Sequence, residues 1–242
     1  MRAFTAQTRT ELVLSLRNGE QLLVSIVIPL LLLVFFSTVD VLPVPDGVTD
    51  RVDFLAPGIL ALAVMSSAMV SLGIGTGFER QYHVLKRLGS TPLGRGRWVA
   101  AKIALVVGLL VIQGVVIVAV AVALGWSPAG TPWLAPLAIL LGAAAFAGIG
   151  LLMAGTLRGT LTLALANGLY LVLLLLGGTI VPFDRMPGPV GALGEVLPSG
   201  ALSQVLQSCL REGAPGAGTS WVVLVVWALV APLAAVRFFR WD

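Results

Sequence analysis

Side chains that could do chemistry are few in this chain of 242 residues. There is one histidine, His83, and one cysteine, Cys209, so neither a multi-histidine metal site nor a cysteine cage can form. The sequence also lacks the Gly-x-x-x-x-Gly-Lys-[Ser/Thr] loop that holds nucleotide phosphates. We therefore expect no catalytic residue, no metal and no cofactor in this chain.

Composition places the chain in a membrane. Hydrophobic residues make up 58% of it, charged residues make up 11%, and the mean hydropathy is +1.01, whereas about a quarter of the residues of a soluble domain are charged. The centres of the apolar runs contain no Asp, Glu, Lys, Arg or His. Ion-coupled carriers and intramembrane hydrolases place ionisable or nucleophilic groups at that depth, so the pattern disfavours both classes.

Six apolar runs have the length of membrane spans, for which about 20 residues are needed. The turn-forming stretch 125–132 divides the long uncharged run between 103 and 157 into two of them. The expected spans are Gln21–Val39, Phe54–Phe78, Ile103–Leu124, Trp133–Leu157, Thr160–Val181 and Ser220–Val236. The predicted fold is an all-α integral membrane protein, with residues 1–242 forming one transmembrane domain.

The basic residues orient these spans. All Lys and Arg residues except Arg51, Arg185 and Arg211 fall on the side of the N-terminus, and basic residues collect on the cytoplasmic side. Both termini are therefore expected in the cytoplasm. Residues 1–20 have the weak amphipathic pattern of an interfacial helix. The apolar segment 182–219 suggests two short helices that dip into the outer leaflet.

The most specific pattern lies between the second and third spans, where Phe78 to Arg97 reads FERQYHVLKRLGSTPLGRGR. It resembles the loop between helices two and three of type-2 ABC exporter permeases, although that family often has glycine where His83 stands. A second stretch, Gly177–Phe183 followed by Met186-Pro187 and Leu197-Pro198, resembles the end of helix five and the outer re-entrant hairpin. In order and spacing the resemblance covers essentially the whole chain.

This resemblance implies a transport subunit that docks a separate cytoplasmic ABC ATPase, present in two copies and carrying the ATP and Mg. Twelve spans are needed in the family's translocation unit, so a second permease, either the same chain or a sister chain, is expected. Within the cytoplasmic loop 79–102, a helix over Glu79–Leu88 would be the coupling helix. The residues expected to couple to the ATPase are Glu79, Arg80, Tyr82, Leu85 and Arg87.

Three polar residues in the spans are candidates for a substrate path. Gln113 and Asn167 lie near the centres of the third and fifth spans, and Tyr170 follows Asn167 by one turn on the same face. Hydrogen bonding between helices is the alternative role for these amides. Glu195, in the expected hairpin, is a candidate for an outer gate or an ordinary exposed carboxylate.

The resemblance implies export, with a role in antibiotic resistance. The uncharged spans favour an apolar or amphipathic cargo, such as a drug, an antibiotic or a lipid. The expected location is the cell membrane, in contact with its lipids and with no nucleic-acid partner. The competing hypotheses are a membrane anchor or immunity subunit that does not transport, and a secondary carrier.

Overall fold

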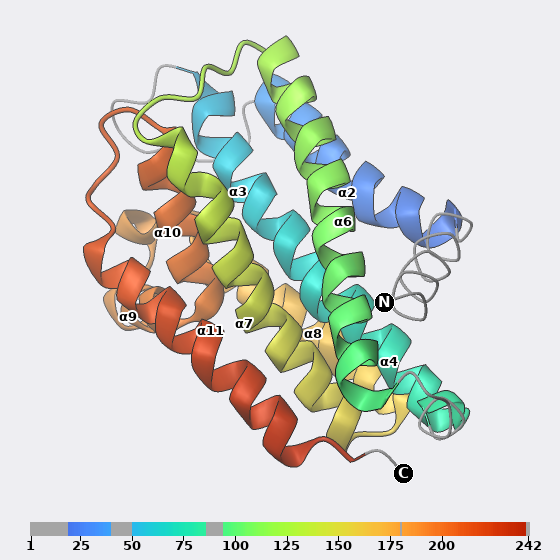
Figure 1. Cartoon of the computed structure of the whole chain (residues 1–242). Helices are drawn as coiled ribbons and strands as arrows, with labels where there is room; N and C mark the ends of the chain where they lie inside the picture. Colours follow the sequence, from blue (N-terminus) through green and yellow to red (C-terminus); the bar gives the residue numbers. More distant parts are fainter. Residues whose placement is uncertain (1–18, 40–49, 86–93, 180, 241–242) are drawn as a thin grey trace.

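The structure is a computed structural model that describes residues 19–39, 50–85, 94–179 and 181–240, and every regular element in these ranges is helical (Figure 1). The interfacial helix expected over 1–20 lies almost wholly outside these residues, as does Arg87. The main helices are α2 (Gly19–Thr38), α3 (Arg51–Met65), α4 (Leu72–Gln81), α6 (Gly94–Ala123), α7 (Ala135–Thr156), α8 (Gly159–Leu176), α9 (Gly188–Val196), α10 (Pro198–Leu210) and α11 (Gly218–Phe238). Shorter elements are the π-helical turn η1 (Ser66–Ser71) and the 3-10 turns η2 (Pro132–Leu134) and η3 (Phe183–Arg185).

Within the described residues, five helical segments are long and apolar enough to cross a membrane. They are Arg51–Gln81, Val99–Ala123, Pro132–Thr156, Gly159–Leu176 and Gly218–Phe238. These segments correspond to the second to sixth expected spans and confirm a multi-pass membrane protein. For the first expected span, α2 is helical over Gly19–Thr38, and its side chains are described from Ile26 to Thr38, where the helix is apolar. The count of six spans therefore stays a prediction.

The fifth span ends earlier than expected. Helix α8 stops at Leu176, whereas the apolar run suggested an end at Val181. Gly178 follows with a φ of 65°, in the left-handed region where glycine carries no steric penalty and commonly terminates helices. The end of this span is thus set by backbone geometry, which hydropathy does not report.

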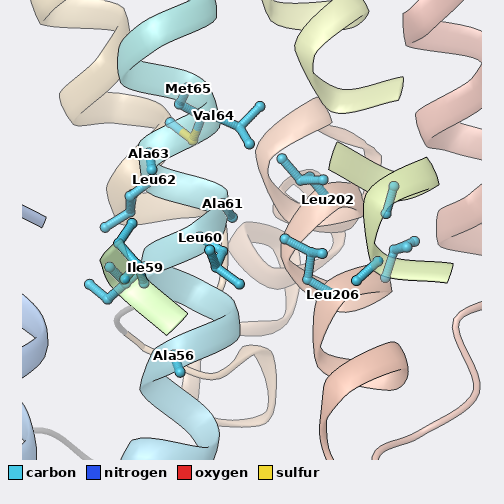
Figure 2. Close-up of a cluster of buried hydrophobic side chains, with 14 of the residues drawn as sticks. Ala56, Ile59, Leu60, Ala61, Leu62, Ala63, Val64, Met65, Leu202 and Leu206 are labelled. Carbon is cyan, nitrogen blue, oxygen red and sulfur yellow. The ribbon is translucent and has the colours of Figure 1, made fainter. Parts of the chain in front are cut away.

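The second span forms the buried centre of the bundle. Helix α3, the turn η1 and helix α4 run as one continuous segment, and nearly all of α3 is buried. Figure 2 shows Leu60 and Val64 of α3 pointing toward Leu202 and Leu206 of α10. A helix that is apolar on every side can be enclosed in this way.

Helix α7 packs closely against both this central segment and α11 because its contact faces are made of glycine and alanine. A Cβ atom at Gly148 would lie 2.4 Å from the backbone nitrogen of Pro232 in α11. A Cβ atom at Gly150 would lie 2.7 Å from the carbonyl oxygen of Met69 in η1. Backbone therefore meets backbone on two sides of α7.

The segment 182–219 contains two short helices, α9 and α10, as expected. Helix α10 is buried against α3, where the Gln207 side-chain nitrogen donates to the Phe54 carbonyl at 2.7 Å. The Trp227 indole donates to the Val196 carbonyl at the end of α9, at 2.9 Å. Because Trp227 lies nine residues into α11, this contact is about 14 Å along that helix from its first residue. The pair α9–α10 thus lies beside the spans.

Candidate functional site

An ion pair joins the end of the second span to the third. The Lys102 ammonium of α6 lies 2.5 Å from the Glu79 carboxylate in the last turn of α4, and the two side chains are 8% and 28% exposed. A charge pair that is partly removed from water holds its elements together strongly, because separating it leaves a poorly solvated charge. This contact therefore ties the end of α4 to α6.

The next residue ties the same turn to the fourth span. The Arg80 guanidinium donates from Nη1 to the Ala154 carbonyl at 2.8 Å. Ala154 is in the last turn of α7, where carbonyl groups lack partners within the helix and a cation is favoured by the helix dipole. Close by, a Cβ atom at Gly159, the first residue of α8, would lie 2.6 Å from the Gln81 side-chain oxygen. Three successive residues of α4 thus face three other helices.

We name the region that holds Glu79–Leu85, Lys102 and Ala154–Gly159 the Glu79 end of the bundle. The helix expected over Glu79–Leu88 is wrong in its start, since Glu79–Gln81 are the last turn of α4 and the chain turns at Tyr82 and His83 before helical geometry resumes at Val84. His83 has a φ of 57°, and its N–H donates to the Arg80 carbonyl at 3.0 Å, as at a helix end that glycine usually occupies.

The expected coupling residues divide into two groups. Glu79 and Arg80 point into the bundle, as above, and Leu85 is 3% exposed. Tyr82 is 65% exposed, and its ring stacks on Phe78 with centroids 6.0 Å apart. Among the expected coupling residues that the structure describes, Tyr82 is therefore the exposed one, while Glu79, Arg80 and Leu85 contact the bundle.

Gln113 is enclosed in the bundle. Its side chain is 1% exposed, and its Oε1 atom accepts a hydrogen bond from the Ser67 hydroxyl at 2.7 Å. Ser67 belongs to the π-helical turn η1, an element that is rare and often marks functional sites. The contact is a hydrogen bond between spans, the alternative considered for this amide.

Asn167 and Tyr170 lie elsewhere, on α8. The Asn167 side chain is exposed and donates to the Leu163 carbonyl of its own helix at 2.9 Å, and Tyr170 is half-buried. Because Gln113 is buried and Asn167 is exposed, the structure does not bring the three candidate path residues onto one surface of a single chain. Glu195 is exposed on α9.

Sequence reasoning did not find the partners of the Glu79 end. In the sequence, Lys102 is the last charged residue of the loop 79–102. A lysine at the start of an apolar run needs a nearby carboxylate when it is buried, and this requirement could have pointed to Glu79. The acceptor of Arg80 is a backbone carbonyl, which carries no sequence signal.

Within the described residues, no group of three or more His, Cys, Asp or Glu side chains could hold a metal ion. The arrangement at the Glu79 end can transmit movement between spans.

Comparison with known proteins agrees with this architecture. The model of the ABC-2 type transporter family matches residues 2–208. The chain is 29% identical over 224 residues to the curated protein "Putative transport permease YvfS" of Bacillus subtilis (strain 168), and the match covers 89% of this chain and 88% of that protein. This chain therefore belongs to the ABC-2 type transporter family and is a transmembrane subunit of an ABC transporter.

Proposed function

We propose that this chain forms the translocation path of an ATP-driven exporter for an apolar or amphipathic substrate, and that it docks its ATPase through the Glu79 end. The observation that carries the proposal is the linkage around Tyr82. This exposed ring follows Glu79 and Arg80, the residues that contact α6 and α7, with only Gln81 between them. A force applied at Tyr82 would thus move three spans together, because an ion pair and a charged hydrogen bond hold them as one body.

The ATPase in this scheme is a separate chain that carries the ATP and Mg and is present in two copies. In general, members of this family work with an ABC ATPase. We place the Glu79 end and both termini in the cytoplasm, because the basic residues cluster on that side. Chemistry then belongs to the ATPase, and this chain supplies the conduit and the coupling.

A second permease, either the same chain or a sister chain, would cover the exposed face of α8. Asn167 lies on that face among exposed apolar side chains such as Leu163 and Leu171. Polar side chains in membrane spans usually face protein or a water-filled path rather than lipid. An interface between two permeases at Asn167 and Tyr170 would give them such surroundings and would form the path between the two chains.

The helices α9 and α10 would form the outer re-entrant hairpin. The contact between Trp227 and Val196 supports this, because it lies about 14 Å along a spanning helix. Exposed apolar residues on α9, including Leu193 and Val196, would face lipid at that depth. Glu195 lies between them and is the candidate gate residue.

Transport by inverted vesicles tests the function. Vesicles that contain the permease and its ATPase would be given a panel of fluorescent amphipathic dyes and a fluorescent phospholipid. An exporter accumulates at least one probe with ATP, and vanadate stops it. Uptake that needs no ATP and collapses with an ionophore would mean a secondary carrier, and no uptake with a bound, active ATPase would favour an anchor or immunity subunit.

Substitutions in α8 and α6 should have different effects. We expect Asn167→Leu to change the transport of individual probes by about ten-fold, since a polar contact to cargo is lost, while the amount of folded protein stays the same. Gln113→Leu should instead lower stability by about 1 kcal/mol, because it removes the hydrogen bond to Ser67. Probe uptake and thermal unfolding, measured on both variants, separate the two roles. Unchanged uptake of every probe by Asn167→Leu would remove this residue from the path.

A further inference from the structure

A groove on the outside of the bundle has no role in the transport scheme above. Its volume is about 670 Å³, and it lies between α6, α7 and α11, three helices that Figure 1 shows next to one another with α7 in the middle. The floor is made of small buried residues, among them Ala143, Gly148 and Ala235. Lys102 is the one lining residue with a charged or polar side chain.

The groove opens sideways rather than into the bundle. Residues on its rims are exposed, with Ile103 of α6 at 55%, Leu140 of α7 at 51% and Val236 of α11 at 81%. In a membrane this opening faces the hydrocarbon of the lipids, or a partner that replaces them. Apart from Lys102, the walls offer a soluble ligand no polar side chain.

The length of the groove matches one leaflet. Its lining on α7 runs from Leu140 to Leu151, which is about 16 Å of helix. The hydrocarbon core of a bilayer is about 30 Å thick, so the groove covers half of it. A helix from another chain would follow the spans through both leaflets, whereas an acyl chain occupies one.

One end of the groove lies at the Glu79 end of the bundle and carries positive charge. The chain leaves α11 there, and Phe239 lines the groove while the Arg240 N–H donates to the Gly155 carbonyl at 3.1 Å. Arg237 and Arg240, on either side of Phe239, are exposed. Glu79 pairs with Lys102, and Arg237 and Arg240 are the exposed cations next to the groove-lining Phe239.

We propose that this groove is a binding site for an anionic phospholipid of the leaflet at the Glu79 end. One acyl chain lies between α6 and α11 on the small residues of α7, and the headgroup phosphate meets Arg237 and Arg240. The lipid would set the spacing of α6 and α11 at the point where Lys102 joins α6 to the Glu79 end. The proposal does not depend on what the transporter carries.

Native mass spectrometry of the detergent-purified full chain tests the site, with palmitoyl-oleoyl phosphatidylglycerol and the zwitterionic phosphatidylcholine of the same chains as probes. We expect the wild-type protein to retain phosphatidylglycerol in preference to phosphatidylcholine. Ala144→Trp, which fills the floor of the groove, should lower retention roughly ten-fold. Ala119→Trp, the same change at an exposed position of α6 outside the groove, should leave retention unchanged.

The variants Arg237→Gln and Arg240→Gln test the charge requirement. Each should lower the preference for phosphatidylglycerol over phosphatidylcholine about five-fold. Phosphatidylglycerol with a photoreactive diazirine on its acyl chain should label the wild-type protein within residues 99–107, 140–151 or 228–236. This measurement does not depend on the folding of any variant. Equal retention of both lipids, unchanged retention by Ala144→Trp, or labelling only elsewhere would overturn the proposal. Loss of a dimer in Ala144→Trp without loss of lipid would assign the groove to a second copy instead.

Discussion

Replacing Lys102 with methionine is expected to uncouple ATP hydrolysis from transport and to destabilise the permease. The Glu79 carboxylate would lose the cation 2.5 Å away in a partly buried place. Removing one member of a fully buried pair costs about 3–5 kcal/mol. Because Glu79 is 28% exposed and water compensates part of the loss, we expect about 2 kcal/mol here. Thermal unfolding in detergent and the ratio of transport to ATP hydrolysis in vesicles measure the two effects.

The charge swap gives this prediction its control. Glu79→Lys and Lys102→Glu should each be defective alone, because each places two like charges together, and the double variant should recover much of the coupling. Arg158→Met removes an exposed cation at the same end of the bundle and should behave as wild type. If Lys102→Met transports normally, the pair does not link α4 to α6 in the working transporter.

Replacing Gly148 with alanine is expected to prevent most of the protein from folding. The new Cβ atom would lie 2.4 Å from the Pro232 nitrogen and 2.5 Å from the Ala231 carbonyl carbon, and neither backbone atom can move without shifting α11. Overpacking a core commonly costs about 1–3 kcal/mol and more where no side chain can give way. Because total stabilities are only about 5–15 kcal/mol, we expect a large fall in the yield of monodisperse protein.

Gly114 of α6 provides the matched control, because a Cβ atom there meets nothing within 4 Å. Gly114→Ala should leave the yield unchanged or raise the melting temperature slightly, since alanine is the better helix former. Comparable yields for the two alanine variants would show that α7 and α11 are not in contact at Gly148.

Hydropathy and turn residues were enough to predict the helical class and the approximate positions of the spans. The apolar run after Arg158, for example, gave the start of α8 within one residue. The end of that helix was not predictable in the same way, because Gly178 stops it through a left-handed backbone conformation, while the apolar sequence continues. The π-helical turn at Ser66–Ser71 also has no signature in hydrophobic periodicity.

The site was predictable as a location but not as a set of contacts. The loop pattern directed attention to Glu79, Arg80 and Tyr82, yet it did not tell which side chains turn inward. That depends on Lys102, 23 residues further along the chain, and on the Ala154 carbonyl, both of which reach the site only through the packing of the spans. Likewise, the sequence shows Gln113 only as a polar residue in a span. Its burial and its hydrogen bond to Ser67 are visible only in the structure.

The central claim is that an ABC ATPase docks at the Glu79 end, and photo-crosslinking from Tyr82 tests it most directly. A benzoyl-phenylalanine in place of Tyr82, in full-length permease expressed with its ATPase, keeps an aromatic ring at an exposed position. Trp133 is the matched control position. It is 74% exposed and lies at the start of the segment Pro132–Thr156, whose other end belongs to the Glu79 end of the bundle. The product is identified by mass spectrometry of the crosslinked chain.

We predict a crosslink from position 82 to a chain that contains a Walker A motif, with a yield that changes when vanadate traps the nucleotide state, and no such product from position 133. A crosslink to the ATPase from position 133 and none from position 82 would contradict the account. It would place the ATPase at the other end of the bundle and leave the contacts of Glu79 and Arg80 as structural only.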